Sequence, residues 1–397
     1  MRILIITYWK ETNPGTFLQA LGVQYSLRKV FPKAEIRYLN YLNAIKESEF
    51  LQNVSGDAEL SVDKLTLIQK VKHILALFKR RYLFRKCQKK YMISDNEQFN
   101  LYQADNENKK FIKYENLYDL IIIGSDTIIE SCQIDGKWGV MWPSLQVKAK
   151  KVYFAASADS ANNLYSKTNL YNELKDRVNG FLQIGLRDYV TIDFFKNQLH
   201  CSENRLIKQP DPTFYLPLTL FSISKRKIKK IPIETHKVVF YHFDRFFKYR
   251  ELLANLLHEK GCYLITSEYD PNCDCSLCSL TPFEWAALFK YCDYVLTERF
   301  HDTVFAMRYQ KPVVTVDWKL RVMNERMESK RLSVLKDFDC TENHCIIRSE
   351  DDLPHVVEKL LSINKIDYQE KVRIKVNEMI KKADFCINNI KEIMENN

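Results

Sequence analysis

The sequence has little glycine and lacks the motifs that glycine builds. Only 9 of the 397 residues are glycine, and neither G-x-G-x-x-G nor G-x-x-x-x-G-K-[ST] occurs. The common loops that bind dinucleotides and nucleoside triphosphates are therefore excluded. The G-x-S-x-G turn of α/β-hydrolases and the H-E-x-x-H helix of zinc proteases are missing as well, which excludes those two hydrolase classes.

Long apolar runs are also missing. No uninterrupted run approaches the roughly 18 residues that span a bilayer, so no transmembrane helix is expected. The opening MRILIITYW lacks the apolar core and cleavage site of a signal peptide and is interpreted as a first β-strand. Eleven cysteines, an odd number without an export signal, indicate reduced thiols rather than a disulfide framework. We therefore expect a soluble, cytoplasmic protein.

Metal-binding patterns are sparse. Cys273, Cys275 and Cys278 lie within one loop, but no second Cys/His cluster follows at zinc-site spacing, which favours a variable, reduced loop. Asp337 and Asp339 resemble an acidic pair that holds a divalent ion in some sugar-nucleotide enzymes. A three-residue match arises easily by chance, so a solvated loop is the simpler interpretation, and no metal site is predicted.

The charge balance favours anionic partners. The chain has 60 Lys and Arg against 50 Asp and Glu, a net charge of +10, which fits phosphates, nucleic acid or a membrane surface. Part of the excess lies at 70–92, where apolar positions recur at helical spacing beneath a basic face. Two interpretations stay open: a solvated face of a packed helix, or a peripheral contact with the inner face of the plasma membrane.

Short apolar runs alternate with helical patterns through both halves of the chain, which is typical of βαβ units around a parallel sheet. We expect an α/β protein with two doubly wound Rossmann-like domains facing a central cleft. The expected boundaries are an N-terminal domain at 1–221 with a basic helical insertion at about 63–92, a linker at 222–236, a C-terminal domain at 237–350, and C-terminal helices at 351–397 that pack back on the first domain.

In an open α/β sheet, ligands bind beyond the carboxyl ends of the strands, so the residues after each apolar run are the candidate site. Reading the runs in order gives Asn13 and Gly15; Gly124, Ser125 and Asp126; Ser157 and Asp159; Arg187 and Asp188; and Arg299 with Phe300 and His301.

Arg299 and His301 stand just before a segment with helical character, for which Asp302 or Thr303 is the expected N-cap. A helix N-terminus next to an arginine is an anion site, and Arg187 offers a second planar fork for a carboxylate or phosphate. A packed or capping role is the simpler alternative for His301. Asp126 has a similar alternative as the cap of a helix after Gly124.

Five stretches together resemble the polysaccharide pyruvyl transferase family, in the family's order and over nearly the whole chain. They are NPGTFLQAL, YDLIIIGSD, LRDYVTIDFF, PDPTFYL and ERFHDTVFAMRYQKPVV. The R-F-H…A…K-P-V-V and D-P-T-F matches are specific, whereas NPG is a looser match to Asn-Tyr-Gly. Two loops depart from the family pattern, at TIIE after GSD and at SADSAN, and both would lie toward the acceptor side.

The resemblance implies a GT-B-like fold and the transfer of pyruvate from phosphoenolpyruvate onto two hydroxyls of a sugar as a cyclic ketal. The first domain would hold the acceptor and the second the donor. Arg187, Arg299 and His301 match the family's donor-binding motifs. The acceptor implied is a galactose-like sugar in a lipid-linked or nucleotide-linked repeat unit of a capsule or exopolysaccharide.

This chemistry assigns roles to the candidates. His301 is the expected proton carrier because imidazole titrates nearest to neutral pH, and Asp126 is the group expected to orient or deprotonate the acceptor hydroxyl. The other candidate substrate contacts are Asn13, Gly15, Gly124, Ser125 and Phe300. No cofactor is demanded, because arginines can neutralise the departing phosphate.

Three alternatives remain at this stage. A GT-B glycosyltransferase using a nucleotide sugar shares the expected architecture, because a fold does not fix a function. An inactive family relative fits the altered acceptor-side loops. A basic nucleic-acid-binding protein fits the net charge, but no recognised motif supports it, and no nucleic acid partner is predicted.

Overall fold

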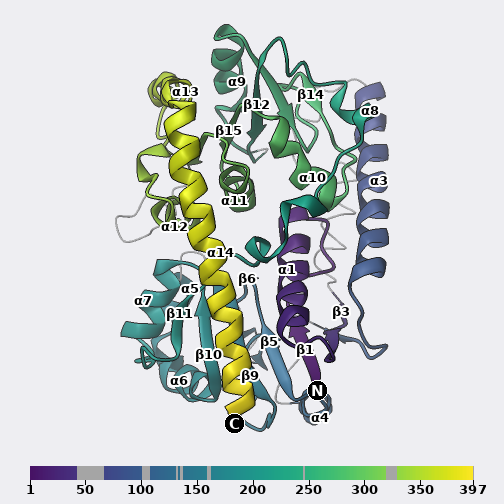
Figure 1. The fold of residues 1–397 in the computed structure, drawn as a ribbon, viewed down its shortest axis with the longest axis vertical. Helices are drawn as coiled ribbons and strands as arrows, with labels where there is room; N and C mark the ends of the chain where they lie inside the picture. The colour runs from purple at the N-terminus through teal and green to yellow at the C-terminus, as the bar shows by residue number, and fades with distance from the viewer. Residues whose placement is uncertain are drawn as a thin grey trace.

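The computed structural model describes residues 1–42, 67–100, 108–130, 133–134, 137–158, 162–244, 246–318 and 329–396. Two parallel sheets organise them, one in each half of the chain (Figure 1). The predicted fold class, two α/β domains with parallel sheets, is confirmed. Asp159 and the start of the predicted insertion, 63–66, lie outside the described residues.

The first sheet has the strand order β11-β10-β9-β5-β1-β2, with β6 paired to β9, and every pairing is parallel. Because β1 lies between β2 and β5, the winding direction reverses there, which makes the loops after β1 and β5 the natural ligand position. The strands are β1 (Arg2–Ile6), β2 (Glu35–Tyr38), β5 (Leu120–Ile123), β6 (Asp126–Thr127), β9 (Lys150–Ser157), β10 (Phe181–Leu186) and β11 (Leu206–Lys208).

The second sheet has the order β14-β13-β12-β15-β16-β17 and is also parallel. Its winding reverses between β12 and β15, so the loop that carries Arg299 and His301 follows a strand at the reversal. The strands are β12 (Lys237–His242), β13 (Cys262–Thr266), β14 (Cys275–Ser276), β15 (Tyr294–Thr297), β16 (Val313–Asp317) and β17 (His344–Ile346).

Helices connect and cover these strands (Figure 1). Two short strand pairs lie outside the sheets, β3 (Tyr41–Leu42) with β4 (Phe99–Asn100) and β7 (Gln133–Ile134) with β8 (Lys137–Trp138). The α-helices are α1 (Pro14–Val30), α3 (Leu67–Tyr91), α4 (Lys109–Glu115), α5 (Asn162–Tyr165), α6 (Tyr171–Asn179), α7 (Tyr189–Asn197), α8 (Lys225–Ile228), α9 (Arg250–Glu259), α10 (Pro282–Leu288), α11 (Phe300–Arg308), α12 (Lys330–Asp337), α13 (Leu353–Ser362) and α14 (Lys365–Asn396).

Helix α1 is buried on nearly all sides of its first two turns, because it lies between the halves of the molecule. Asn13 caps it, accepting from the backbone N–H groups of Gly15 and Thr16, and Pro14 occupies the first turn where its missing N–H has no cost. Gly22 lets the 3-10 turn at Pro212–Tyr215 approach: a Cβ at that position would overlap the carbonyl oxygen of Pro212.

Helix α14 runs along both halves of the molecule (Figure 1). Tyr368 donates to the sulfur of Met307 in the second half, at 3.2 Å. Asn389 donates to Gln183 in the first half at 2.7 Å, and the Tyr215 hydroxyl donates to the backbone of Ala383. These contacts brace the two halves against each other and so fix the geometry of anything held between them.

Helix α3 is the described part of the basic insertion. One of its faces packs against the loop after β1. Gln88 donates to the backbone of Trp9 and Glu11, Arg80 donates to the backbone of Thr12, and the ring of Phe84 is buried. Figure 1 shows α3 along one edge of the molecule. Within the described residues, no helix combines the length and the apolar character that crossing a bilayer requires.

The expected caps differ from the observed ones. Helix α11 begins at Phe300 with Arg299 as its N-cap residue, so the expectation of Asp302 or Thr303 is wrong. The Asp302 carboxylate instead accepts from Thr297 in the preceding strand, and the Thr303 hydroxyl donates to the Arg299 carbonyl. The Arg299 side chain makes no capping hydrogen bond to the helix.

Asp126 does not cap a helix either. It follows Gly124 in a tight turn and enters β6, which pairs with the end of β9. Gly124 has a φ of 128° and Asp126 a φ of 94°, left-handed values that a helix cap does not use. A Cβ at Gly124 would overlap the carbonyl oxygen of Phe154, so glycine is required there on two counts.

Gly22→Ala should destabilise the fold although alanine is normally the better helix former. The added Cβ meets a backbone carbonyl that cannot rotate away, and overpacking of this kind costs about 1–3 kcal/mol. Urea unfolding measures the change. Gly180→Ala is the matched control, because its Cβ would make only ordinary contacts, with Lys151 at 3.4 Å. Equal stability of the two variants would contradict the packing argument.

Candidate functional site

The candidate residues gather where the carboxyl edges of the two sheets face each other. Arg187 follows β10, the Gly124 turn follows β5, and Arg299 and His301 follow β15. The strand ends predicted from the apolar runs are therefore confirmed at these loops. Both groups of loops flank a winding reversal, the usual position of a ligand in open parallel sheets.

Asp126, Arg187, Asp211 and His301 form what we call the central cluster. The Arg187 guanidinium is 3.2 Å from Asp211 and 3.9 Å from Asp126, and only 3% of its side chain is exposed. His301, from the second half, brings Nε2 to 3.9 Å from Asp211. The Arg187 guanidinium also lies 4.1 Å from the centre of the Phe300 ring. Residues from both halves thus meet in one buried group of charges.

The first turn of α1 packs against the central cluster. Gly15 packs directly against the His301 ring, because a Cβ at that position would overlap the imidazole. The Thr16 hydroxyl donates to Asp126 at 3.0 Å. Asn13, which caps this turn, therefore acts by holding Gly15 and Thr16 in place.

Several polar atoms of the central cluster and its neighbour Ser125 have no hydrogen-bond partner among the described residues. They are Arg187 Nε and Nη2, His301 Nε2 and Ser125 Oγ, all buried. Buried polar groups are nearly always paired, and an unmade hydrogen bond costs about 1–3 kcal/mol. A guanidinium fork, an imidazole and a hydroxyl left unpaired in one place can together hold an oxyanion.

The charges of the cluster shift one another's pKa values. Burial alone would raise the pKa of Asp126, but Arg187, Lys330 and His301 outweigh burial and lower it to about 2. The pKa of Asp211 is lowered for the same reason, with His301 and Arg187 opposing burial. Burial lowers the pKa of His301 against the pull of Asp211 and Asp126. The aspartates are therefore ionised and the imidazole is neutral near pH 7.

Arg299 does not join the central cluster. Its side chain, 44% exposed, lies 3.9 Å from both Asp244 and Glu298. Burial would lower the pKa of Arg299, but the surrounding carboxylates, Glu268 first among them, raise it.

Arg299 and His242, with the carboxylates around them, form what we call the second cluster; these carboxylates are Asp244, Glu268, Glu298 and Asp302. His242 Nδ1 lies 2.7 Å from Asp302, and its Nε2 lies 3.6 Å from Glu268. Burial alone would lower the pKa of His242, but the two carboxylates raise it to about 9, so the imidazolium persists at neutral pH. Glu268 also pairs with Arg80 of α3, at 3.2 Å. The second cluster thus ties the insertion to the second sheet.

Thr16, Asp211, His242 and Lys330 are among the residues in or beside these clusters that were not predicted from the sequence. Lys330 donates to Thr127 at 3.1 Å and so reaches the first half from α12. Asp211 lies within the quoted motif PDPTFYL, which was the only available signal for it. His242 ends an apolar strand, KVVFYH, and the strand-end rule applied to that run would have found it.

The residues considered as metal ligands in the sequence are not grouped as a metal site. Asp337 accepts from Lys208 and Tyr189, and Asp339 pairs with Lys375 at 2.8 Å. Cys273, Cys275 and Cys278 are free thiols. In the part of the chain that the structure describes, no three His, Cys, Asp or Glu side chains are grouped as metal ligands would be.

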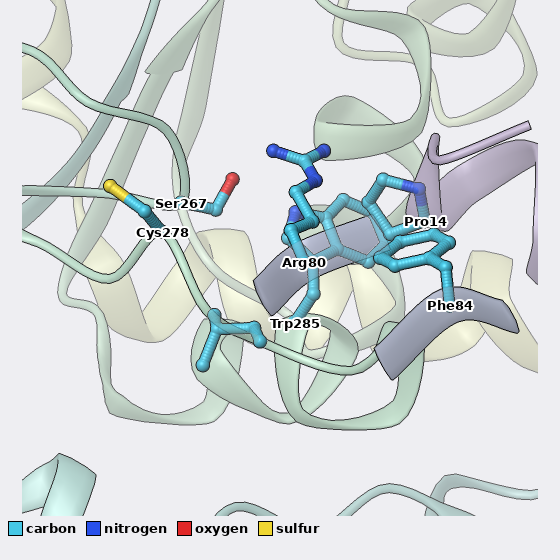
Figure 2. Close-up of a pocket in the computed structure, with 7 residues that line it drawn as sticks. Pro14, Arg80, Phe84, Ser267, Cys278 and Trp285 are labelled. Atoms are coloured by element: carbon cyan, nitrogen blue, oxygen red, sulfur yellow. The ribbon is translucent and has the colours of Figure 1, made fainter. Parts of the chain in front are cut away.

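A small recess lies between α3, the start of α1 and the second half (Figure 2). It is lined by Pro14, Arg80, Phe84, Ser267, Cys278, Leu280 and Trp285.

The model of the polysaccharide pyruvyl transferase family matches residues 13–319, a span that holds both clusters except Lys330. The chain belongs to this family. The family model covers the first turn of α1, the Gly124 turn, Arg187, and the Arg299–His301 segment. No curated protein sequence matches the chain.

Solved structures show the same fold at low sequence identity. UDP-GlcNAc 2-epimerase from Neisseria meningitidis, bound to UDP-GlcNAc, matches with a TM-score of 0.57 and 13% identity, over 98% of this chain and 99% of that one. Anabaena HepE in complex with UDP and glucose matches with a TM-score of 0.54 and 11% identity, over 98% and 97%. These likenesses confirm the predicted GT-B-like architecture.

His242 and His301 should titrate on opposite sides of the ordinary histidine pKa of 6.5. We expect His242 to titrate near pH 9 and His301 below 6.5, as followed by NMR of the ring carbons. Asp302→Asn should lower the pKa of His242, because it removes the closer of its two carboxylates. Asp339→Asn, at a carboxylate paired with Lys375, is the control and should change neither titration. A wild-type His242 titration below pH 7 would contradict the assignment.

Proposed function

We propose that the chain transfers the pyruvyl group of phosphoenolpyruvate onto two hydroxyls of a sugar in a polysaccharide repeat unit or its precursor, forming a cyclic ketal. Family membership supports the reaction class. The observation that carries the choice of donor is the set of buried, unpaired polar atoms on Arg187, His301 and Ser125. These atoms suit a small oxyanion.

The donor is placed by its two anionic groups. Arg187 presents two unpaired nitrogens as a fork to phosphate or carboxylate, and Lys330 adds a second fixed cation nearby. Arg299 reaches the same cleft from the second cluster, where it must leave Asp244 or Glu298 to engage the donor. Asn13, Gly15 and Phe300 act indirectly, by positioning His301 and Arg187.

The reaction balances in atoms and charge, with His301 as the acid. C3 of phosphoenolpyruvate gains a proton, positive charge develops at C2, and a sugar hydroxyl oxygen bonds to C2. The C2–O bond to phosphate then breaks, and the second hydroxyl oxygen bonds to C2 and closes the ketal. Of the two hydroxyl protons released, one balances the proton gained by C3 and the other leaves with phosphate. His301 carries the proton to C3.

Charge balance explains how His301 becomes an acid. Arg187 and Lys330 offset Asp126 and Asp211, so the central cluster together with Lys330 is neutral while the imidazole is neutral. A bound phosphate adds negative charge and raises the pKa of His301 from its lowered value. Donor binding therefore protonates His301, which supplies the proton that C3 receives.

Asp126 orients the acceptor in this scheme. With a pKa of about 2 it is a weak base, so accepting a hydrogen bond from a sugar hydroxyl suits it better than removing the proton. The cations neutralise the departing phosphate, so the scheme uses no cofactor and we propose that activity persists in EDTA. The acceptor we propose is a galactose-like sugar on a lipid or nucleotide carrier.

Calorimetric titration with phosphoenolpyruvate at pH 7, in two buffers of different ionisation enthalpy, tests this proposal. We expect saturable binding with net proton uptake, because the donor raises the pKa of His301. His301→Gln should abolish the uptake. Arg187→Lys should weaken binding about 10- to 100-fold through the lost fork, and Arg299→Ala should weaken it less. Binding of UDP-glucose but not of phosphoenolpyruvate would overturn the proposal in favour of a glycosyltransferase.

We further propose that the protein works at an anionic membrane surface, held there by α3. Residues Val71, Leu75 and Tyr82 recur at helical spacing and are 49%, 63% and 65% exposed. The opposite face of the helix is pinned by Phe84 and Gln88, so this exposed stripe faces away from the body of the protein.

Charge favours a lipid surface over a second copy of the chain. Residues 67–91 carry nine lysines and arginines and no aspartate or glutamate, so two such helices would repel each other. Nucleic acid would satisfy the charge but offers no apolar phase to the stripe. An anionic leaflet satisfies both, with basic side chains at the headgroups and the stripe at the acyl boundary.

Vesicle sedimentation at physiological salt tests the membrane proposal. The wild type should bind phosphatidylcholine vesicles that contain phosphatidylglycerol, and binding should fall as salt rises. Leu75→Glu should weaken binding about tenfold or more, because burial of a leucine contributes about 1.5–3 kcal/mol. Leu145→Glu is the control, since Leu145 is 64% exposed but lies outside α3. Equal binding by the two variants would refute the role of α3.

A further inference from the structure

Helix α12 contacts the first half of the molecule at both of its ends. Its first residue, Lys330, donates to the Thr127 hydroxyl at 3.1 Å. Its last residue, Asp337, accepts from Lys208 at 2.5 Å and from the Tyr189 hydroxyl at 2.9 Å. Figure 1 shows α12 next to α7 and β11, where the two halves meet. The helix belongs to the second half of the chain and therefore bridges the joint.

The partners of Asp337 lie on the segments that carry the central cluster. Tyr189 is two residues after Arg187, and Lys208 ends β11 three residues before Asp211. Asp337 is thus bonded to the same two segments that hold the buried guanidinium and one of its carboxylates. A displacement of α12 relative to these segments would move its first turn relative to the central cluster.

The contact between Asp337 and Lys208 is mostly buried. Only 11% of the Asp337 side chain and 21% of the Lys208 side chain are exposed. Fully exposed ion pairs contribute little to stability, whereas removing one partner of a buried pair leaves a charge without compensation. The next residue, Phe338, adds an apolar contact, because its ring stacks on Phe214 of the first half at 6.2 Å. The end of α12 is therefore held by specific contacts.

The start of α12 is fixed to the second half. Arg331, next to Lys330, donates to the carboxylate of Asp317 at the end of β16 and to the backbone carbonyl of Glu298 at 2.5 Å. These contacts alone would let the helix follow the second half. The contacts of Asp337 are what tie its position to the first half.

The charge of Lys330 acts on the central cluster. Burial lowers the pKa of His301, Asp211 and Asp126 raise it, and Arg187 and Lys330 lower it further. The interaction between two charges weakens with the distance between them, so the pKa of His301 depends on where the Lys330 ammonium lies. The imidazole therefore reports the position of α12.

We propose that Asp337 is a positioning residue: through Lys208 and Tyr189 it fixes α12 on the first half and so holds the Lys330 ammonium beside the central cluster. The benefit for donor binding rests on the proposed function, in which Lys330 is the second fixed cation for phosphoenolpyruvate. The placement of Lys330 by Asp337 does not rest on it. Asp337 itself contacts no reacting atom.

NMR titration of the His301 ring carbons in the full chain tests the inference without a ligand. Asp337→Asn should raise the pKa of His301, because Lys330 moves away from the imidazole. The direct effect of removing a negative charge has the opposite sign, so a rise identifies the displacement. Tyr189→Phe removes the second donor without a change of charge and should produce a smaller rise. In a Lys330→Met background, Asp337→Asn should cause no rise.

Asp339→Asn is the matched control. It removes the same charge two residues later, but Asp339 pairs with Lys375 of α14 at 2.8 Å and not with the first half. The melting temperature of each variant verifies that it is folded. A His301 pKa that is unchanged or lowered in Asp337→Asn and unchanged in Tyr189→Phe would overturn the proposal. An equal rise in Asp339→Asn would do the same.

Calorimetry with phosphoenolpyruvate separates this inference from the proposed function. Asp337→Asn should weaken donor binding about 3- to 10-fold, the usual range for a residue that acts through another. If the wild type binds no phosphoenolpyruvate but Asp337→Asn raises the pKa of His301, the positioning role stands and pyruvyl transfer is refuted. If the donor binds and turns over, and Asp337→Asn changes neither the pKa nor the affinity, the positioning role is refuted and the transfer stands.

Discussion

A buried group of opposite charges at the joint between the two halves is the constraint on which the rest of the structure depends. Arg187 lies between Asp126 and Asp211, and His301 approaches the same aspartate from the other half. An uncompensated buried charge costs several kcal/mol, so the two aspartates of the first half need both Arg187 and Lys330, and Lys330 reaches them from α12 only while the halves keep their relative position. The long contacts of α14 and the burial of α1 between the halves maintain that position.

One turn of helix serves several purposes at once. The first residues of α1 have N–H groups without helical acceptors, and their side chains fan out around the axis. Asn13 satisfies the N–H groups, Pro14 faces the recess, Gly15 supports the His301 ring, and Thr16 donates to Asp126. A shift of this turn would therefore disturb the proposed donor and acceptor positions together, which couples them without any moving part.

The sequence predicted the elements that depend on local pattern. Apolar runs predicted the parallel strands, and the strand-end rule placed Gly124, Arg187 and His301 at the facing edges. The sequence could not predict that Arg299 lies near Asp244 and Glu298 while Arg187 lies near His301. These positions depend on side-chain packing between the two halves. The cap of α11 was missed because Asp302 had a stronger use, as the partner of Thr297 and His242.

The excess of basic residues is concentrated on α3 rather than in the cleft. Of the 60 basic residues, nine lie in α3 without an acidic neighbour on that helix, and the remaining 51 nearly balance the 50 acidic residues of the chain. The cleft itself is close to neutral, because each cation of the central cluster faces a carboxylate. In the proposed reaction a strongly positive cleft would hold phosphate after the transfer, whereas a nearly neutral one can release it. The excess positive charge thus lies on the helix that is proposed to meet the membrane, and the proposed donor site stays close to neutral.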